Sequence, residues 1–163
     1  MTRVAAVHGV LPPYRYEQGQ ITEALAAICL PPDGERALGW DIGDAGFTIA
    51  LGAELPELVR LPVGEDVRSF LTEHDLKPPD VTGWVAHPGG PKALDALRES
   101  LGLDSQALEL TRRSLARVGN LFSASLLHIL RDTLALRPAP PGTPGLLLAM
   151  GAGFCSELVP LRW

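Results

Sequence analysis

Short apolar runs alternate with helix-length segments along this chain, and prolines and glycines separate them. Residues 3–11 and 81–86 are rich in β-branched and small apolar residues, which predicts two strands. Residues 17–30 carry apolar side chains at helical spacing and stop at a Pro-Pro pair, which predicts a helix. Residues 37–52 predict two further strands joined by a tight turn near Gly43 to Gly46.

The rest of the chain reads mainly as helices followed by a closing pair of strands. A helix is predicted from just after Pro62 to about His74, with an inward-facing set of Val63, Val67, Phe70 and Leu71. Pro91 suits the first position of the next helix, and Gly102 suits its end. The apolar stripe of that helix is Leu94, Leu97 and Leu101.

Two more helices are predicted over residues 105–118 and 120–136. One side of the longer helix is predicted to carry Leu126, Leu127, Leu130 and Leu134. Residues 145–150 and 154–161 read as the closing strands, so the whole order is β-α-β-β-α-β-α-α-α-β-β. This mixture predicts a layered α/β domain, a sheet covered by helices.

Composition narrows the class of protein. The 163 residues correspond to one domain, and 46% of them are apolar, so either the core is unusually full or a partner covers part of the surface. A net charge of −5 without a long basic run argues against nucleic acid as a partner, and Arg112, Arg113 and Arg117 read as a solvated helix face. The longest apolar run is too short to cross a bilayer, which needs about 20 residues. We therefore expect a cytoplasmic protein that does not enter membranes.

His87 is the first candidate for chemistry. It stands where a strand ends and a helix begins, in the stretch His-Pro-Gly-Gly-Pro. Backbone N–H groups and the helix dipole at such a place favour negative charge, and glycines let a ligand approach the backbone. A histidine at a strand end also often has a purely structural role.

Two further segments leave alternatives open. Asn120 follows a glycine at the start of a predicted helix, so it can serve as an N-cap or donate a hydrogen bond into a pocket. Gly151 and Gly153 form a Gly-x-Gly between two strands, which suits either a plain hairpin or a loop that shapes a cavity. Cys29 and Cys155 have no metal-type spacing and no helix N-terminus to activate them, so both read as small core residues and no metal is expected.

Three segments in this order carry a resemblance: "WVAHPGGPKALDAL" (residues 84–97), "RVGNLFSAS" (residues 117–125) and "MGAGFCSELV" (residues 150–159). Together they resemble the C-terminal half of type III polyketide synthases, the chalcone and stilbene synthase family, and the bacterial naphthalene-synthase-like branch is the most similar. Residues 38–59 are similar to the opening of that half, and residues 5–30 to the extreme N-terminus of the family.

The resemblance implies a thiolase-like fold and a dimer. Family members place two similar α/β halves in each subunit and use a Cys-His-Asn triad on malonyl-CoA, with no separate cofactor. By motif, His87 matches the family histidine and Asn120 the asparagine. Gly89, Gly90 and Pro91 match the stretch lining the coenzyme A tunnel, and the loop of Gly151 and Gly153 matches the one that shapes the cyclisation cavity.

The chain departs from the family in length. Similarity to the N-terminal half stops near Pro32, and similarity to the C-terminal half resumes near Glu35, so residues 1–33 are expected to be a remnant of the first half and residues 36–163 the C-terminal domain of an incomplete thiolase-like fold. Neither Cys29 nor Cys155 matches the nucleophile by motif.

Three hypotheses follow from this departure. The domain contributes His87 and Asn120 to a site that another chain completes. Alternatively, it is a non-catalytic interaction or dimerisation module, or a deletion remnant without a selected role. Acyl-CoA thioesters and either a second copy or a complementary N-terminal half are the expected partners.

Overall fold

The computed structural model describes residues 38–43, 46–151 and 154–163. Within these ranges the order of the main elements is the predicted one, strand-strand-helix-strand, three helices and two strands. The strand predicted at residues 3–11 and the helix predicted at residues 17–30 lie outside the described residues, as does the proposed remnant at residues 1–33.

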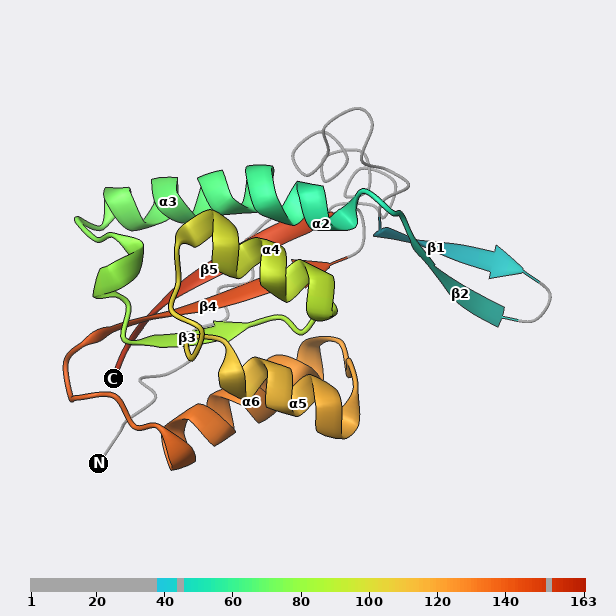
Figure 1. Ribbon diagram of the computed structural model, residues 1–163. Coiled ribbons are helices and arrows are strands. Elements are labelled where there is room, and N and C mark those ends of the chain that lie inside the picture. Colours follow the sequence, from blue (N-terminus) through green and yellow to red (C-terminus); the bar gives the residue numbers. More distant parts are fainter. Residues whose placement is uncertain (1–37, 44–45, 152–153) are drawn as a thin grey trace, which may run out of the picture.

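The first two strands form a sheet of their own. β1 (Leu38–Gly43) and β2 (Gly46–Leu51) pair antiparallel, with Leu38 opposite Leu51 and Gly43 opposite Gly46. The predicted pair of strands is therefore confirmed, and the turn predicted between them falls on residues 44–45, outside the described residues. In Figure 1 this hairpin extends away from the main body of helices and strands.

The main sheet has three strands in the order β3-β4-β5. β3 (Gly83–Ala86) runs parallel to β4 (Pro144–Gly151), and β4 runs antiparallel to β5 (Cys155–Arg162). Three helices connect β3 to β4, which provides the long crossover that parallel strands require. All four residues of β3 are buried, as predicted for this strand.

One helical run covers the first face of the sheet and begins earlier than predicted. It comprises α2 (Leu55–Leu58), a π-helical segment η1 (Val59–Val63) and α3 (Gly64–Glu73). The helix predicted from just after Pro62 to about His74 is confirmed as α3, whereas α2 and η1, which extend the run ahead of it, were not predicted. The wide turns of η1 contain Pro62, whose missing N–H would break a regular α-helical turn. The core side of the run is Val59, Val63, Val67 and Leu71, with Phe70 partly buried.

The helix after His87 packs on the same face. α4 (Pro91–Leu101) begins at Pro91 as predicted, and Gly102 ends it in a left-handed conformation with φ 62°. The predicted stripe of Leu94, Leu97 and Leu101 is buried. A short 3₁₀ turn, η2 (Pro78–Asp80), precedes β3.

The second face of the sheet is covered by α6 (Ser123–Leu136), which follows α5 (Glu109–Val118). Both helices begin three or four residues later than predicted. Leu126 and Ile129 face the sheet, whereas Leu127 is 68% exposed and was wrongly placed on the apolar side. One residue turns a helix by about 100°, so Leu126 and Leu127 cannot share a narrow stripe. Helices on both faces of the sheet confirm the layered α/β architecture.

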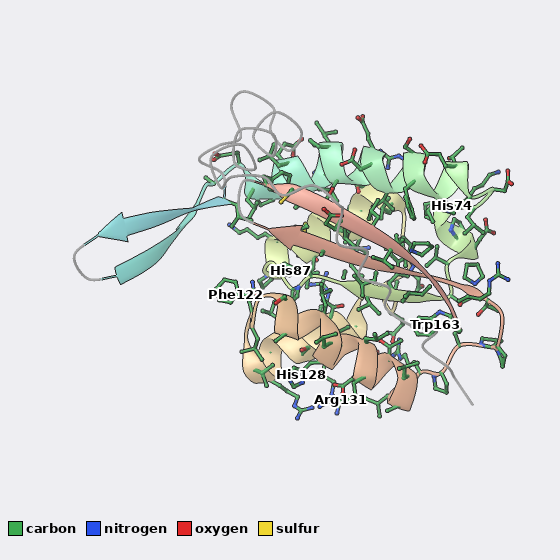
Figure 2. The ribbon with its side chains drawn as sticks, turned by 180° about the vertical axis from the view of Figure 1, so that it is seen from behind. His74, His87, Phe122, His128, Arg131 and Trp163 are labelled. Atoms are coloured by element: carbon green, nitrogen blue, oxygen red, sulfur yellow. The ribbon has the colours of Figure 1, made fainter. Side chains whose placement is uncertain are left out.

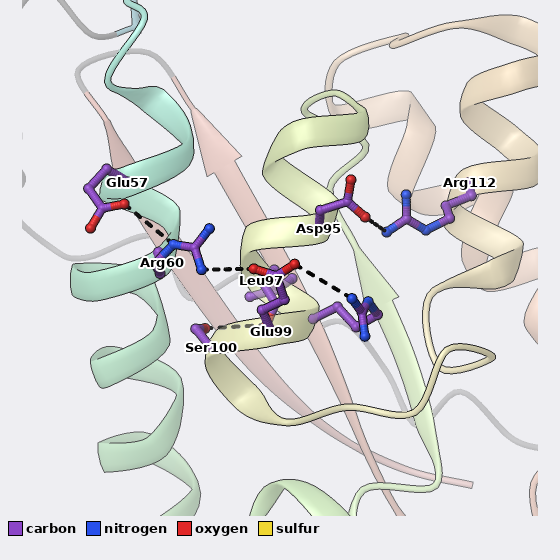
Figure 3. Close-up of polar contacts among 8 residues, drawn as sticks. Glu57, Arg60, Asp95, Leu97, Glu99, Ser100 and Arg112 are labelled. Carbon is purple, nitrogen blue, oxygen red and sulfur yellow. Dashed lines mark hydrogen bonds and ion pairs between the residues drawn. The ribbon is translucent and has the colours of Figure 1, made fainter.

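Ion pairs connect α4 to its neighbours at the surface. Arg60 Nη1 lies 2.8 Å from Glu99 Oε2, and Arg112 Nη2 lies 2.7 Å from Asp95 Oδ1, as Figure 3 shows. Both pairs are exposed, and water screens their attraction, so apolar burial holds the layers together. No helix among the described residues has the length and the apolar character needed to cross a membrane.

Candidate functional site

His87 directly follows β3 and is held in the sheet by its backbone. Its N–H donates to the carbonyl of Leu148 on β4 at 2.8 Å, which continues the pairing of the two strands by one residue. The side chain is only 8% exposed. The imidazole is therefore a buried polar group placed at the carboxyl end of a parallel strand pair.

Asn120 reaches the same place from the turn before α6. Its Nδ2 lies 3.3 Å from Nε2 of His87, although the two residues are 33 positions apart in the sequence. Its Oδ1 accepts a 2.9 Å hydrogen bond from the N–H of Phe122. Asn120 is not the N-cap of α6, which begins at Ser123. It closes the preceding turn with its oxygen and presents its amide nitrogen to the histidine.

The glycine-rich turn after His87 has a special backbone. Gly90 adopts φ +133°, a conformation that L side chains rarely reach, and this permits Pro91 to start α4 immediately. Gly89 donates its N–H to the carbonyl of His87 at 2.9 Å. Of these three predicted binding residues, only Gly89 lines the cavity described next.

A cavity of about 340 Å³ lies against His87 and Asn120. This volume lies within the range of about 300–1,000 Å³ that is typical of small-molecule sites. Gly151 is one of its lining residues, whereas Gly153 lies outside the described residues. The other lining residues are Leu38, Gly39, Leu55, Val59, Gly89, Ala93, Phe122, Ser123, Leu126, Ala149, Met150 and Phe154.

Two aromatic residues of this lining escaped sequence reasoning. Phe122 and Phe154 both adopt left-handed backbone conformations, with φ 54° and φ 48°. They belong to the segments 117–125 and 150–159, which carry the family resemblance, but the apolar periodicity predicted a helix at Phe122 and a strand at Phe154. In the structure each occupies the turn before its element. Figure 2 labels Phe122 and His87 at the same end of the sheet.

The site favours an uncharged imidazole. Burial lowers the pKa of His87 below its ordinary value of 6.5, because removing the imidazolium from water costs free energy. No acidic side chain and no cysteine is among the described residues that line the cavity. Cys155 is partly buried at the start of β5, opposite Gly151 in the strand register. The NH₂ group of the carboxamide can donate a hydrogen bond to a carbonyl oxygen, and the neutral imidazole beside it can accept a proton.

Metal binding receives no support from the described part of the chain. No group of three or more histidine, cysteine, aspartate or glutamate residues there is arranged to hold a metal ion.

The lowered pKa of His87 predicts a pH dependence of stability. The unfolded chain binds a proton to this ring near pH 6.5, whereas the folded chain resists protonation to lower pH. Stability therefore rises with pH in the window between the lowered pKa and 6.5, and the contribution is lost as the pH falls through that window. Urea unfolding of the wild type and of His87→Gln between about pH 5 and pH 8 measures this effect. An equal loss of stability in both proteins on acidification would contradict the prediction.

The sequence that contains these residues is similar to known proteins over most of its length. A family model described as chalcone and stilbene synthases, C-terminal domain, matches residues 22–162. The chain is 51% identical over 134 residues to the 1,3,6,8-tetrahydroxynaphthalene synthase of Streptomyces peucetius subsp. caesius, covering 82% of this chain and 36% of that protein.

Solved structures give the same result for the fold. The 1,3,6,8-tetrahydroxynaphthalene synthase of Streptomyces coelicolor A3(2), a bacterial type III polyketide synthase, matches with a TM-score of 0.76 and 29% identity, covering 82% of this chain and 38% of that one. PKS-I of the brown alga Ectocarpus siliculosus matches with a TM-score of 0.71 and 27% identity, covering 80% and 36%. The predicted thiolase-like fold of a C-terminal portion is confirmed, and this chain spans little more than a third of the length of these relatives.

Proposed function

Because the chain belongs to the chalcone and stilbene synthase family, we propose that its cavity binds the acyl thioester of an acyl-CoA. The carbonyl oxygen accepts a hydrogen bond from Nδ2 of Asn120 and, once Nε2 of His87 carries a proton, from that ring as well. The observation that carries this proposal is the 3.3 Å approach of Asn120 Nδ2 to His87 Nε2 beside the cavity. One oxygen atom that lies beside this pair of nitrogens, on the side of the cavity, can come within hydrogen-bond distance of both of them. The apolar lining strengthens such hydrogen bonds, because it excludes competing water.

The reaction we propose for the complete site is the decarboxylative condensation of malonyl units. A cysteine thiol gives its proton to Nε2 of His87, and its sulfur attacks the acyl carbon of the first thioester. The bond from that carbon to the sulfur of coenzyme A breaks, and coenzyme A leaves as a thiolate that takes a proton from water. When the bound malonyl thioester loses CO₂, the pair of electrons from the broken carbon–carbon bond passes into an enolate. The amide N–H of Asn120 and the protonated Nε2 of His87 then donate hydrogen bonds to the enolate oxygen, which carries the negative charge. The enolate carbon attacks the acyl carbon held on the cysteine, the carbon–sulfur bond breaks, and the cysteine leaves as a thiolate.

The nucleophile of this reaction is proposed to come from another polypeptide segment. Cys155 lies on β5 outside the cavity lining, and Cys29 lies outside the described residues. Neither matches the nucleophile of the family by motif. A segment equivalent to the N-terminal half of the longer relatives would supply the thiol, and without it covalent loading has no acceptor.

Incubation of the 163-residue chain with malonyl-CoA tests this proposal. We expect no pentaketide naphthol and no pyrone by mass spectrometry, because no cysteine is among the described residues that line the cavity. We also expect acetyl-CoA to change the NMR signals of the His87 ring at concentrations at which free coenzyme A does not. Polyketide formed by the pure chain would overturn the need for a second segment. Absence of any acetyl-CoA effect on His87 would overturn the thioester site.

A second candidate function is an interaction or dimerisation module, and exposed apolar side chains favour it. Leu127, Phe122 and Leu121 are 68%, 49% and 40% exposed on and beside the first turns of α6. A second copy or a complementary half would cover them. A monomer by light scattering would argue against the dimer. A poorly soluble chain would instead favour a deletion remnant.

A further inference from the structure

The turn that carries Asn120 is closed by three hydrogen bonds. The N–H of Leu121 donates to Oγ of Ser125 at 2.7 Å, and the N–H of Ser125 donates to the carbonyl of Phe122 at 3.0 Å. The N–H of Phe122 donates to Oδ1 of Asn120 at 2.9 Å. The backbone and side-chain groups of four residues thus depend on one another for their positions.

Ser125 anchors this turn to the core. It lies in the first turn of α6 and is fully buried, at 0% exposure, so its hydroxyl has a defined position. Phe122, between the anchor and the asparagine, adopts φ 54° and ψ −135°. Such a conformation costs a non-glycine residue on the order of 1–3 kcal/mol of free energy, and it persists only where neighbouring contacts hold it.

The hydrogen bonds leave the carboxamide of Asn120 one orientation. A carboxamide has an accepting oxygen and a donating NH₂ group, and a flip exchanges their places. The N–H of Phe122 is a donor, so the oxygen must face it and the NH₂ group must face His87. Because an NH₂ group only donates, Nε2 of His87 must accept with its lone pair. The proton of a neutral ring then resides on Nδ1.

We infer that Ser125 is a positioning residue, which holds the carboxamide of Asn120 in one flip state through the turn and thereby keeps Nε2 of His87 unprotonated before substrate binds. The inference deepens the proposed function, on which its catalytic meaning rests. An unprotonated Nε2 facing the cavity is the form of the ring that can accept the proton of an incoming thiol. The opposite tautomer would present an N–H there and could not act as a base.

Long-range proton–nitrogen NMR of the ¹⁵N-labelled chain above pH 7 reads the tautomer directly, because protonated and unprotonated ring nitrogens resonate far apart. We expect an unprotonated Nε2 and a protonated Nδ1 for His87 in the wild type. In Asn120→Asp the carboxylate cannot donate, so we expect the proton to move to Nε2 and the pKa of His87 to rise. A wild-type ring with its proton on Nε2 would overturn the inference.

Variants of Ser125 test its role as the anchor. Ser125→Ala removes the acceptor for the N–H of Leu121, and we expect the carboxamide to sample both orientations and a substantial Nε2–H population to appear in His87. Ser125→Thr keeps the hydroxyl, and we expect it to retain the wild-type pattern. If Ser125→Ala does not fold, Ser125→Cys provides the same test, because a thiol of similar size accepts hydrogen bonds only weakly. We expect it also to show a substantial Nε2–H population in His87. A folded Ala or Cys variant with the wild-type tautomer would overturn the positioning role.

These outcomes are separable from those of the proposed function. The tautomer is measured on the chain without any acyl-CoA. A ring with its proton on Nε2 overturns the inference and the role of His87 as the base for the thiol, but it leaves the thioester site standing, because an Nε2–H can still donate to a carbonyl oxygen. Failure of acetyl-CoA to affect a His87 ring with an unprotonated Nε2 overturns only the thioester site.

Discussion

Replacing His87 with Gln is expected to lower malonyl-CoA decarboxylation by about 100-fold or more in a complete synthase that contains this domain. A positioned proton donor or acceptor typically contributes about 10² to 10⁴ to a rate, and glutamine cannot take up and return a proton. The test uses a chimera in which residues 38–163 replace the matching segment of the Streptomyces peucetius relative, to which the chain is 51% identical. Release of labelled CO₂ measures the rate.

His74→Gln is the matched control for this chimera. His74 is exposed at the end of α3, and its Nδ1 contacts the carbonyl of Phe70 at 2.8 Å, away from the residues that line the cavity. We expect the rate of this variant to stay within about twofold of the parent, the range of a surface substitution away from a site. A His87→Gln chimera with more than a tenth of the parent rate would contradict the proposed role.

The effect of Asn120 is expected to overlap with that of His87. Removing one donor from a site that stabilises an oxyanion typically costs about 10² to 10³ in rate. Because both side chains are proposed to hold one oxygen, the second substitution should cost much less than the first. A double variant whose loss equals the product of the two single losses would indicate that the residues act on different atoms.

The elements of this fold are largely predictable from local pattern. Pro91 and Gly102 mark the ends of α4 because proline suits the first helical position and glycine the left-handed end. The helix after Pro62 was predicted for the same kind of reason, but the helical residues before it were missed, because a proline normally starts or breaks a helix. The tertiary structure accommodates it in a π-helical segment whose flanking Val59 and Val63 are buried.

The residues of the candidate site could be predicted from sequence motifs, but not from the periodicity of apolar residues. Nothing in the spacing of His87 and Asn120 shows that their nitrogens approach within 3.3 Å; the crossover from β3 to β4 brings the two turns to one end of the sheet. The alternative roles of Asn120 could not be resolved from sequence, because the oxygen and the nitrogen of one side chain serve two partners. Phe122 was missed because its left-handed backbone interrupts the pattern that predicted a helix from Asn120.

Replacing Ile129 with Ala is expected to remove about 2–5 kcal/mol from the free energy of unfolding, as for other large-to-small changes in a core. Ile129 is fully buried on α6 and forms, with Leu126 and Val85 of β3, the core on the second face of the sheet. A domain of this size typically has about 5–15 kcal/mol of stability, so this single change removes a large share. Urea unfolding monitored by circular dichroism measures it.

Leu127→Ala, on the same helix, is the matched control because its side chain is 68% exposed. We expect its free energy of unfolding to stay within about 0.5 kcal/mol of the wild type. Ile129 packs on β3, the strand that directly precedes His87, and α6 begins directly after the turn that carries Asn120. Loss of this contact should therefore also weaken the approach of Asn120 to His87, visible as a changed His87 ring signal in the folded variant. Equal destabilisation by Ile129→Ala and Leu127→Ala would show that α6 does not hold the layers together through this face.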